Sequence, residues 1–200
     1  MTILPAFFFG DIFYWTLLFE RKNVIIDLHE NYIKQSQRNH TEILGPNGKL
    51  KLTVPVIKPS KINRATGKVA INPHSSFKRE HLQSIKTCYS SSPYFSSFYP
   101  LIEEFYLLEW NTLEEVHRKS MKIIAEILEI PYPFPYSKQY FTATPQDKDE
   151  RLKNKTEIAQ IATYNQVFKE KLGFVSNLSI IDLIFNEGKW ARSFIVENCE

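Results

Sequence analysis

A predicted β-hairpin over residues 35–56 constrains the fold more than any other part of the sequence. Its turn is the GPNG stretch at residues 45–48, where glycine and asparagine tolerate positive φ angles and proline fixes its own. Apolar and polar residues then alternate, which places the apolar ones on one face of a strand. The strand before the turn carries the polar run Arg38, Asn39 and His40. We therefore predict an antiparallel hairpin whose first strand is unusually polar.

The first 27 residues predict a strand, a helix and a second strand, which is compatible with a βαβ unit. A buried strand over residues 2–9 runs into a turn, after which Asp11 can cap a helix over residues 12–19. Residues 24–26 are apolar and β-branched, as suits an interior strand. The expected class is α/β: a mixed sheet with a βαβ-like start and a hairpin, packed with a C-terminal helical portion.

Amphipathic periodicity predicts that helical portion. The expected helices span residues 77–89 and 98–108, a third begins at a capping box of Thr112 and Glu115, and a closing helix lies within residues 177–188. Between the third and the closing helix, we expect a Pro-rich crossing segment over residues 131–155 that forms a lid or an interface arm. In the first of these helices, Phe77, His81 and Ile85 share one face. His81 therefore lies on or beside the core, either as a structural histidine or as a functional one.

Composition predicts one folded domain without general affinity for nucleic acid. The chain has 200 residues, of which 43% are apolar and 24% charged, so it can bury a sizeable core. Its formal net charge of +3 gives no support for electrostatic binding of nucleic acid. We expect a single domain over residues 1–200, with residues 1–75 mainly sheet-forming and residues 76–200 mainly helical.

The cysteine content and the apolar N-terminus indicate the cellular compartment in which the protein is expected to lie. Cys88 and Cys199 make neither a zinc pattern nor a disulfide framework, which favours a reducing environment. The first 19 residues are apolar, but Pro5, Gly10 and Asp11 interrupt them and no basic segment precedes them. We therefore expect a cytoplasmic protein without a transmembrane segment.

Polar side chains follow the end of the second predicted strand, where ligands bind in open α/β sheets. Arg38 and Lys34 suit recognition of a carboxylate or phosphate, and Asp27 or a histidine suits a general base. The predicted ligand-binding residues are Asn31, Lys34, Arg38, Asn39 and His40. The alternative for each of them is a place in a solvated loop. The expected ligand is an anionic small molecule such as a nucleotide-sugar.

Other reaction classes have less support. The sequence has no GxSxG, P-loop, HExxH or CxxC motif, and no glycine-rich dinucleotide loop. Asp27, His29 and His40 are a candidate metal set, although sequence does not fix their spacing in space. We assign no metal ligand, and any cofactor is unknown at this stage.

Short motifs in colinear order cover nearly the whole chain. They are Asn31-Tyr32-x-Lys34-Gln35-x-x-Arg38-Asn39, Asn47-Gly48, Leu52-Thr53-Val54-Pro55-Val56, His81-x-x-Ser84-Ile85-x-x-x-Tyr89, Ser92-Pro93-Tyr94-Phe95, residues 164–168, Gly173-Phe174 and residues 178–188. This set resembles the WbqC-like protein family. The sequence departs from the family pattern at His40, Phe77 and Leu82, where arginine or tryptophan is usual.

The resemblance implies a bacterial protein associated with O-antigen and other surface-polysaccharide gene clusters, with glycine transfer to a sugar as a suggested activity. Our leading hypothesis is therefore an aminoacyl or acyl transferase acting on a nucleotide-linked sugar. Asp27, His81 and Tyr89 are its candidate catalytic residues. The alternative is a non-catalytic module, dimeric in solution, that binds a sugar nucleotide or a glycosyltransferase. A metal-dependent hydrolase is the third hypothesis.

Overall fold

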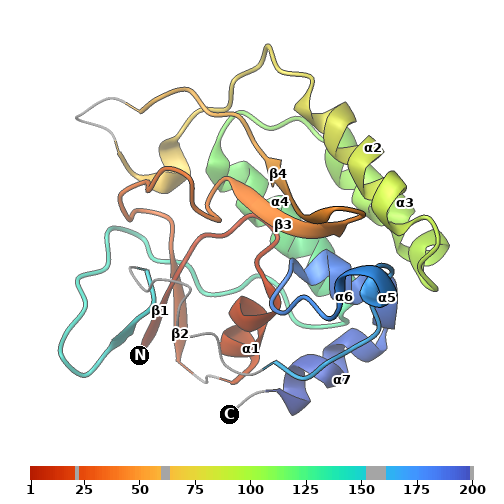
Figure 1. Ribbon diagram of the computed structural model, residues 1–200. Helices are drawn as coiled ribbons and strands as arrows, with labels where there is room; N and C mark the ends of the chain where they lie inside the picture. Colours follow the sequence, from red (N-terminus) through yellow and green to blue (C-terminus); the bar gives the residue numbers. More distant parts are fainter. Residues whose placement is uncertain (21–22, 60–63, 152–160, 199–200) are drawn as a thin grey trace.

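The computed structural model describes residues 1–20, 23–59, 64–151 and 161–198 (Figure 1). Its elements are β1 (Thr2–Pro5), α1 (Ile12–Glu20), β2 (Val24–Asp27), β3 (His40–Gly45), β4 (Gly48–Thr53), η1 (Thr66–Lys68), α2 (Phe77–Tyr89), α3 (Phe95–Leu107), α4 (Leu113–Ile127), β5 (Lys148–Asp149), α5 (Lys169–Leu172), α6 (Ile180–Glu187) and α7 (Trp190–Glu197). Cys199 and residues 152–155 of the predicted crossing segment lie outside the described residues.

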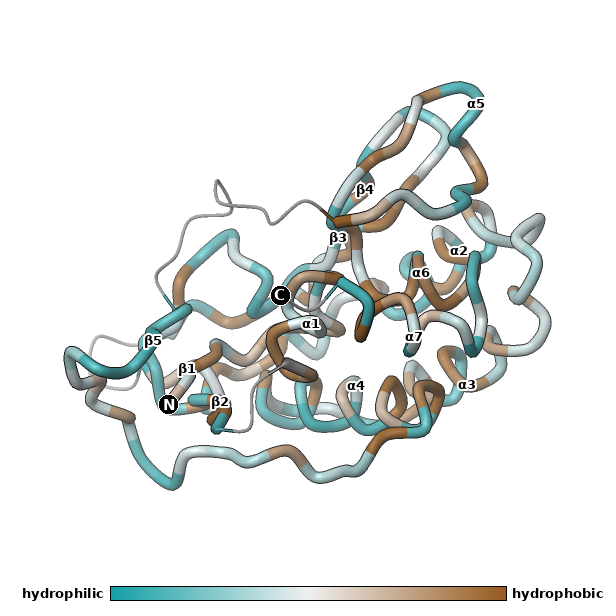
Figure 2. The backbone as a smooth tube through the Cα atoms, turned by 90° about the horizontal axis from the view of Figure 1, so that it is seen from below, coloured by the Kyte–Doolittle hydropathy of each residue, from teal (hydrophilic) through white to brown (hydrophobic). Residues whose placement is uncertain are grey.

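The α/β class is confirmed, but the described strands form two sheets and not one mixed sheet. Three parallel strands lie in the order β2-β1-β5, and β3 pairs with β4 as a separate antiparallel hairpin. In Figure 1 the hairpin lies between the parallel sheet and the neighbouring helices α2 and α3. Figure 2 shows hydrophobic residues concentrated in α6, while β5 and the adjoining chain are hydrophilic.

The predicted βαβ unit is confirmed. β1 pairs in parallel with β2, with Pro5 opposite Asp27 at the carboxyl ends. The Asp11 carboxylate accepts a hydrogen bond from the Tyr14 N–H at 2.8 Å and so caps α1 as expected. The first strand ends at Pro5 and not at residue 9, because its partner β2 ends at Asp27, opposite Pro5. The chain then turns through positive φ angles at Phe9 and Gly10.

The hairpin and the helices also follow the predicted pattern closely. Gly45 pairs with Gly48 around a two-residue turn. Only His40 of the polar run belongs to β3. α2 has the predicted bounds, whereas α3 begins at residue 95, three residues before the predicted start. The Thr112 hydroxyl caps α4 by accepting from the Glu115 N–H at 3.4 Å.

The crossing segment adds strand pairing to both sides of the β1–β2 pair. The Ile26 N–H donates to the Pro135 carbonyl at 2.9 Å, and the Ser137 N–H donates to the Ile26 carbonyl at 2.9 Å. Farther along, β5 pairs with β1, and the Glu150 N–H donates to the Ile3 carbonyl at 2.9 Å. These contacts hold the segment against both sides of the strand pair, near the carboxyl end of β2 and the amino end of β1.

Candidate functional site

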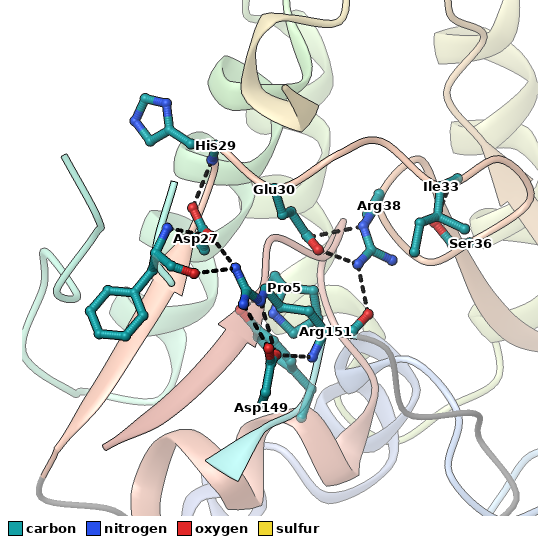
Figure 3. A network of polar contacts seen from close by, with 11 residues as sticks. Pro5, Asp27, His29, Glu30, Ile33, Ser36, Arg38, Asp149 and Arg151 are labelled. Carbon is teal, nitrogen blue, oxygen red and sulfur yellow. Dashed lines mark hydrogen bonds and ion pairs between the residues drawn. The ribbon is translucent and has the colours of Figure 1, made fainter. Parts of the chain in front are cut away.

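Asp27, the last residue of β2, is a fully buried hydrogen-bond acceptor at the carboxyl edge of the parallel sheet. Its oxygens accept from the His29 N–H (2.9 Å), Ser137 Oγ (2.8 Å), the Phe141 N–H (3.2 Å) and Arg151 Nη1 (2.6 Å). Figure 3 shows the contacts of Asp27 with His29 and Arg151, with the His29 ring pointing away from the carboxylate. Asp27 thus joins the loop after β2 to the crossing segment.

Arg151 is shared between two carboxylates. Its Nε and Nη2 donate to Asp149 at 2.9 and 2.6 Å, in addition to its contact with Asp27. The hydrogen bonds with Asp149 raise the pKa of Arg151 and lower the pKa of Asp149, so both groups are charged. The guanidinium also lies 4.9 Å from the ring centre of Tyr140.

A second buried ion pair lies beside the first. Arg38 Nε and Nη2 donate to the Glu30 carboxylate at 2.9 and 2.5 Å, and Nη2 also donates to the Arg151 carbonyl at 3.0 Å. Both side chains are at most 4% exposed. Burial raises the pKa of Glu30 to about 7, although the hydrogen bond and charge of Arg38 lower it. The strand end therefore carries two connected pairs of buried charges.

The other predicted ligand-binding residues lie on both sides of these pairs. Asn31 and Lys34 are exposed on the loop that follows β2. Asn39 and His40 are buried where the chain enters the hairpin, and Asn39 Nδ2 donates to the Val54 carbonyl at 3.0 Å. Of the five residues, only Arg38 belongs to the network around Asp27.

His81 lies in an aromatic part of the core. The side chain is 5% exposed, and its Nδ1 is 3.1 Å from the Tyr106 hydroxyl. Burial lowers the pKa of His81 to about 4, although a backbone hydrogen bond with Thr53 raises it. The ring is therefore neutral at physiological pH.

Tyr89 belongs to a third network. Its hydroxyl donates to Asp182 at 2.6 Å and accepts from the Leu44 N–H at 3.1 Å. The Tyr164 hydroxyl bonds to the other Asp182 oxygen at 2.6 Å. No contact in the described part of the chain links this cluster or His81 directly to Asp27, so the three candidate catalytic residues are not brought together.

The comparisons with known proteins agree with the motifs. A model of the WbqC-like protein family matches residues 8–166, which include both buried ion pairs. The chain belongs to the WbqC-like protein family. Neither the curated proteins nor the solved structures provide a match. In the described part of this WbqC-like chain, no helix is long and apolar enough to cross a membrane.

The metal-hydrolase hypothesis finds no ligand set in the described part of this WbqC-like chain. Among the described residues, no three His, Cys, Asp or Glu side chains are grouped so that they could hold a metal ion. Asp27 bonds to the His29 backbone, while the His29 ring points away (Figure 3).

Sequence reasoning assigned no role to Glu30, Arg151 or His117. Glu30 and Arg151 lie in charged runs that are typical of solvated loops, and only tertiary packing buries them. The sequence did contain a signal for His117, because this polar residue lies on the apolar face of α4, next to Val116 and three residues from Ser120. Each of these side chains lies near the chain that follows β1 or β2.

Proposed function

We propose that this protein binds a nucleotide-linked sugar at the carboxyl edge of β1 and β2 and transfers an aminoacyl group, glycine, or an acyl group to it in surface-polysaccharide biosynthesis. The observation that supports it is the pair of buried arginines, Arg38 and Arg151, after the end of β2. Buried ion pairs seldom stabilise a fold more than apolar side chains of the same size. At a strand end where α/β proteins bind ligands, an anion-binding role is the better account.

Glu30 gives Arg38 a way to exchange partners. Because burial raises the pKa of Glu30 to about 7, its carboxylate can take a proton near neutral pH. A neutral Glu30 no longer competes for the guanidinium, which then pairs with a diphosphate or carboxylate of the ligand. Asn31 and Lys34, exposed on the same loop, would contact the outer part of that ligand.

The test removes the competing carboxylate first and the cation second. Titration calorimetry would measure binding of UDP-, GDP- and dTDP-linked sugars to wild type, Glu30→Gln and the double variant Glu30→Gln/Arg38→Gln. We expect Glu30→Gln to bind the cognate sugar nucleotide about tenfold more tightly, and the double variant to lose that gain and fall below wild type.

Glu42→Gln is the matched control, because it removes a carboxylate of the hairpin that pairs with Lys49 and Lys51. Its affinity should equal that of wild type. Equal binding by wild type, Glu30→Gln and the double variant would show that Arg38 is structural and would overturn the proposed anion site.

The second candidate is a module that binds the sugar nucleotide without turnover. It is favoured by the separation of Asp27, His81 and Tyr89, each buried with its polar atoms bonded to protein groups. Mass spectrometry of the sugar nucleotide after incubation with an activated glycyl ester distinguishes the two. A glycylated sugar supports the transferase, whereas tight binding by a dimeric protein without product supports the module.

A further inference from the structure

His117 has one bonded and one unbonded ring nitrogen. It lies on the buried face of α4, and its Nδ1 is 2.8 Å from the Phe7 carbonyl oxygen, two residues after the end of β1. A carbonyl can only accept, so Nδ1 carries the proton. Burial lowers the pKa of His117 to about 4, which keeps the ring neutral at physiological pH. Nε2 is therefore a hydrogen-bond acceptor, and it is buried without a partner among the described residues.

Thr66 supplies a second buried group of this kind. The residue is 1% exposed, and its hydroxyl also has no partner in the described part of the chain. Its backbone N–H donates to the Glu30 carbonyl at 2.8 Å, so η1 is fastened to the chain that follows β2. The Thr66 backbone thus lies next to the residue whose carboxylate pairs with Arg38.

Helix packing brings η1 to the same face of α4 as His117. The two elements pack together, and a Cβ atom at Gly67 would lie 3.3 Å from the Glu114 carboxylate. Glu114 and His117 are three residues apart in a helix, so they lie on the same face. The imidazole and the hydroxyl therefore come from adjoining elements at one end of the β1–β2 pair.

Buried polar atoms almost always have a hydrogen-bond partner in protein or ordered water, so two buried polar groups without a protein partner at a strand end, where ligands bind, are candidates for contact with a ligand. A neutral imidazole lone pair accepts a hydrogen bond from a hydroxyl or amino group, and it would repel an anion. A threonine hydroxyl both donates and accepts. The matching ligand group is neutral and rich in hydroxyls, as a sugar is.

We propose that His117 Nε2 and Thr66 Oγ1 form a subsite that hydrogen-bonds the sugar of a sugar nucleotide. This subsite rests on the proposed function and names a part of the ligand that the arginines do not recognise. Glu30 connects the two regions, because its carbonyl bonds to Thr66 and its carboxylate bonds to Arg38.

The variants separate the ligand contact from the structural one. His117→Asn keeps an N–H near the position of Nδ1 for the Phe7 carbonyl, but it removes Nε2. His117→Gln restores a polar atom near the position of Nε2. Thr66→Val removes the hydroxyl at nearly constant volume. Ser179→Ala is the control, because Ser179 Oγ is also buried without a partner in the described chain but belongs to the N-cap of α6.

Calorimetry would compare the tightest-binding sugar nucleotide of the UDP, GDP and dTDP panel with its nucleoside diphosphate. We expect His117→Asn and Thr66→Val to weaken binding of the sugar nucleotide by about five- to tenfold and to leave binding of the nucleoside diphosphate unchanged. His117→Gln should recover part of the loss, and Ser179→Ala should change neither affinity. Equal weakening of both ligands, or no weakening, would overturn the subsite.

Nitrogen NMR of the His117 ring keeps this test separate from that of the proposed function. If the sugar nucleotide binds but neither the Nε2 signal nor the variants respond, the subsite is wrong and the proposed function stands. If no sugar nucleotide binds, the proposed function fails, and free N-acetylglucosamine at high concentration becomes the probe. A shift of Nε2 with that sugar then supports the subsite, and an unmoved signal overturns it.

Discussion

Asp182 shows how a single buried carboxylate is accommodated in this protein. It has no exposed surface, and the hydroxyls of Tyr89 and Tyr164 bond to its two oxygens at 2.6 Å each. Burial raises the pKa of Asp182 to about 6, although the two tyrosines lower it. The sequence identifies Tyr89 and Asp182 as parts of separate motifs. Their contact spans 93 residues, so only the tertiary packing reveals it.

Asp182 should make the protein less stable as the pH rises. Its pKa is about 6 in the folded state and near 3.8 when unfolded, so the folded state holds more protons between these values. The stabilisation is therefore complete below the unfolded pKa and is lost as the pH rises through about 6. The loss should be about 2 to 3 kcal/mol. Thermal unfolding between about pH 4 and pH 8 should show this decline in wild type relative to Asp182→Asn. Parallel profiles would contradict it.

The Glu30–Arg38 pair should show the cost of removing one partner of a buried ion pair. Arg38→Ala removes the cation that lowers the pKa of Glu30, so at neutral pH the buried carboxyl group takes up a proton and loses its two hydrogen bonds from Arg38. We expect a loss of about 1 to 3 kcal/mol in the free energy of unfolding. Replacing both residues by methionine removes both charges, and it should restore most of that stability. Urea unfolding at neutral pH measures both effects. An Arg38→Ala variant as stable as wild type would show that the pair is not structurally coupled.

At the scale of elements, local patterns predicted the hairpin, α1 and α2, because turn residues, caps and apolar periodicity are encoded within each segment. The crossing segment was different. β5 has two residues, and Tyr136 makes a single bridge with Ile26, which is too short for any periodicity. Pairing with β1 and β2 imposes these extended conformations, so they depend on contacts distant in sequence.

Arg151 should hold the crossing segment on the sheet. Arg151→Met removes its bonds to Asp27, Asp149 and the Phe141 carbonyl. We expect faster amide hydrogen exchange over residues 137–150, with exchange in α4 unchanged. Lys148→Ala is the control, because it removes only the long ion pair, at 3.7 Å, between the exposed Lys148 ammonium and Glu150. Unchanged exchange in the Arg151 variant would show that strand pairing alone holds the segment.

The turn between β1 and α1 should require glycine for two reasons. Gly10 has a φ of 71°, and a Cβ atom there would lie 2.6 Å from Tyr14 Cδ1. Gly173 has the same φ of 71°, but a Cβ atom would meet nothing within 4 Å. Gly173→Ala therefore tests backbone strain alone, with an expected cost of about 1 kcal/mol. Gly10→Ala adds overpacking and should cost about 2 kcal/mol more in chemical unfolding. Equal costs would contradict the steric argument.

For the whole molecule, ligand binding at this edge of the sheet stays a prediction, but the sequence predicted the α/β class and singled out Asp27 and Arg38, which the fold joins through Arg151. It did not predict how the edge is built. The Asp27–Arg151 contact spans 124 residues, and the Thr66 backbone reaches Glu30 from beyond the hairpin. Contacts between residues so far apart leave no signature in the local sequence pattern. The partners that bury and neutralise the charges of Asp27 and Glu30 could therefore be found only in the fold.

The central claim is that the ligand binds at the carboxyl edge of β1 and β2. Amide hydrogen exchange with and without the tightest-binding sugar nucleotide tests it most directly, because it reports on every described element at once. The account predicts slower exchange over residues 6–10, 28–32, 65–67 and 137–141, with no change around His81 in α2 or Asp182 in α6. Protection confined to α2, α6 or the tip of the hairpin would contradict the account and place the site elsewhere.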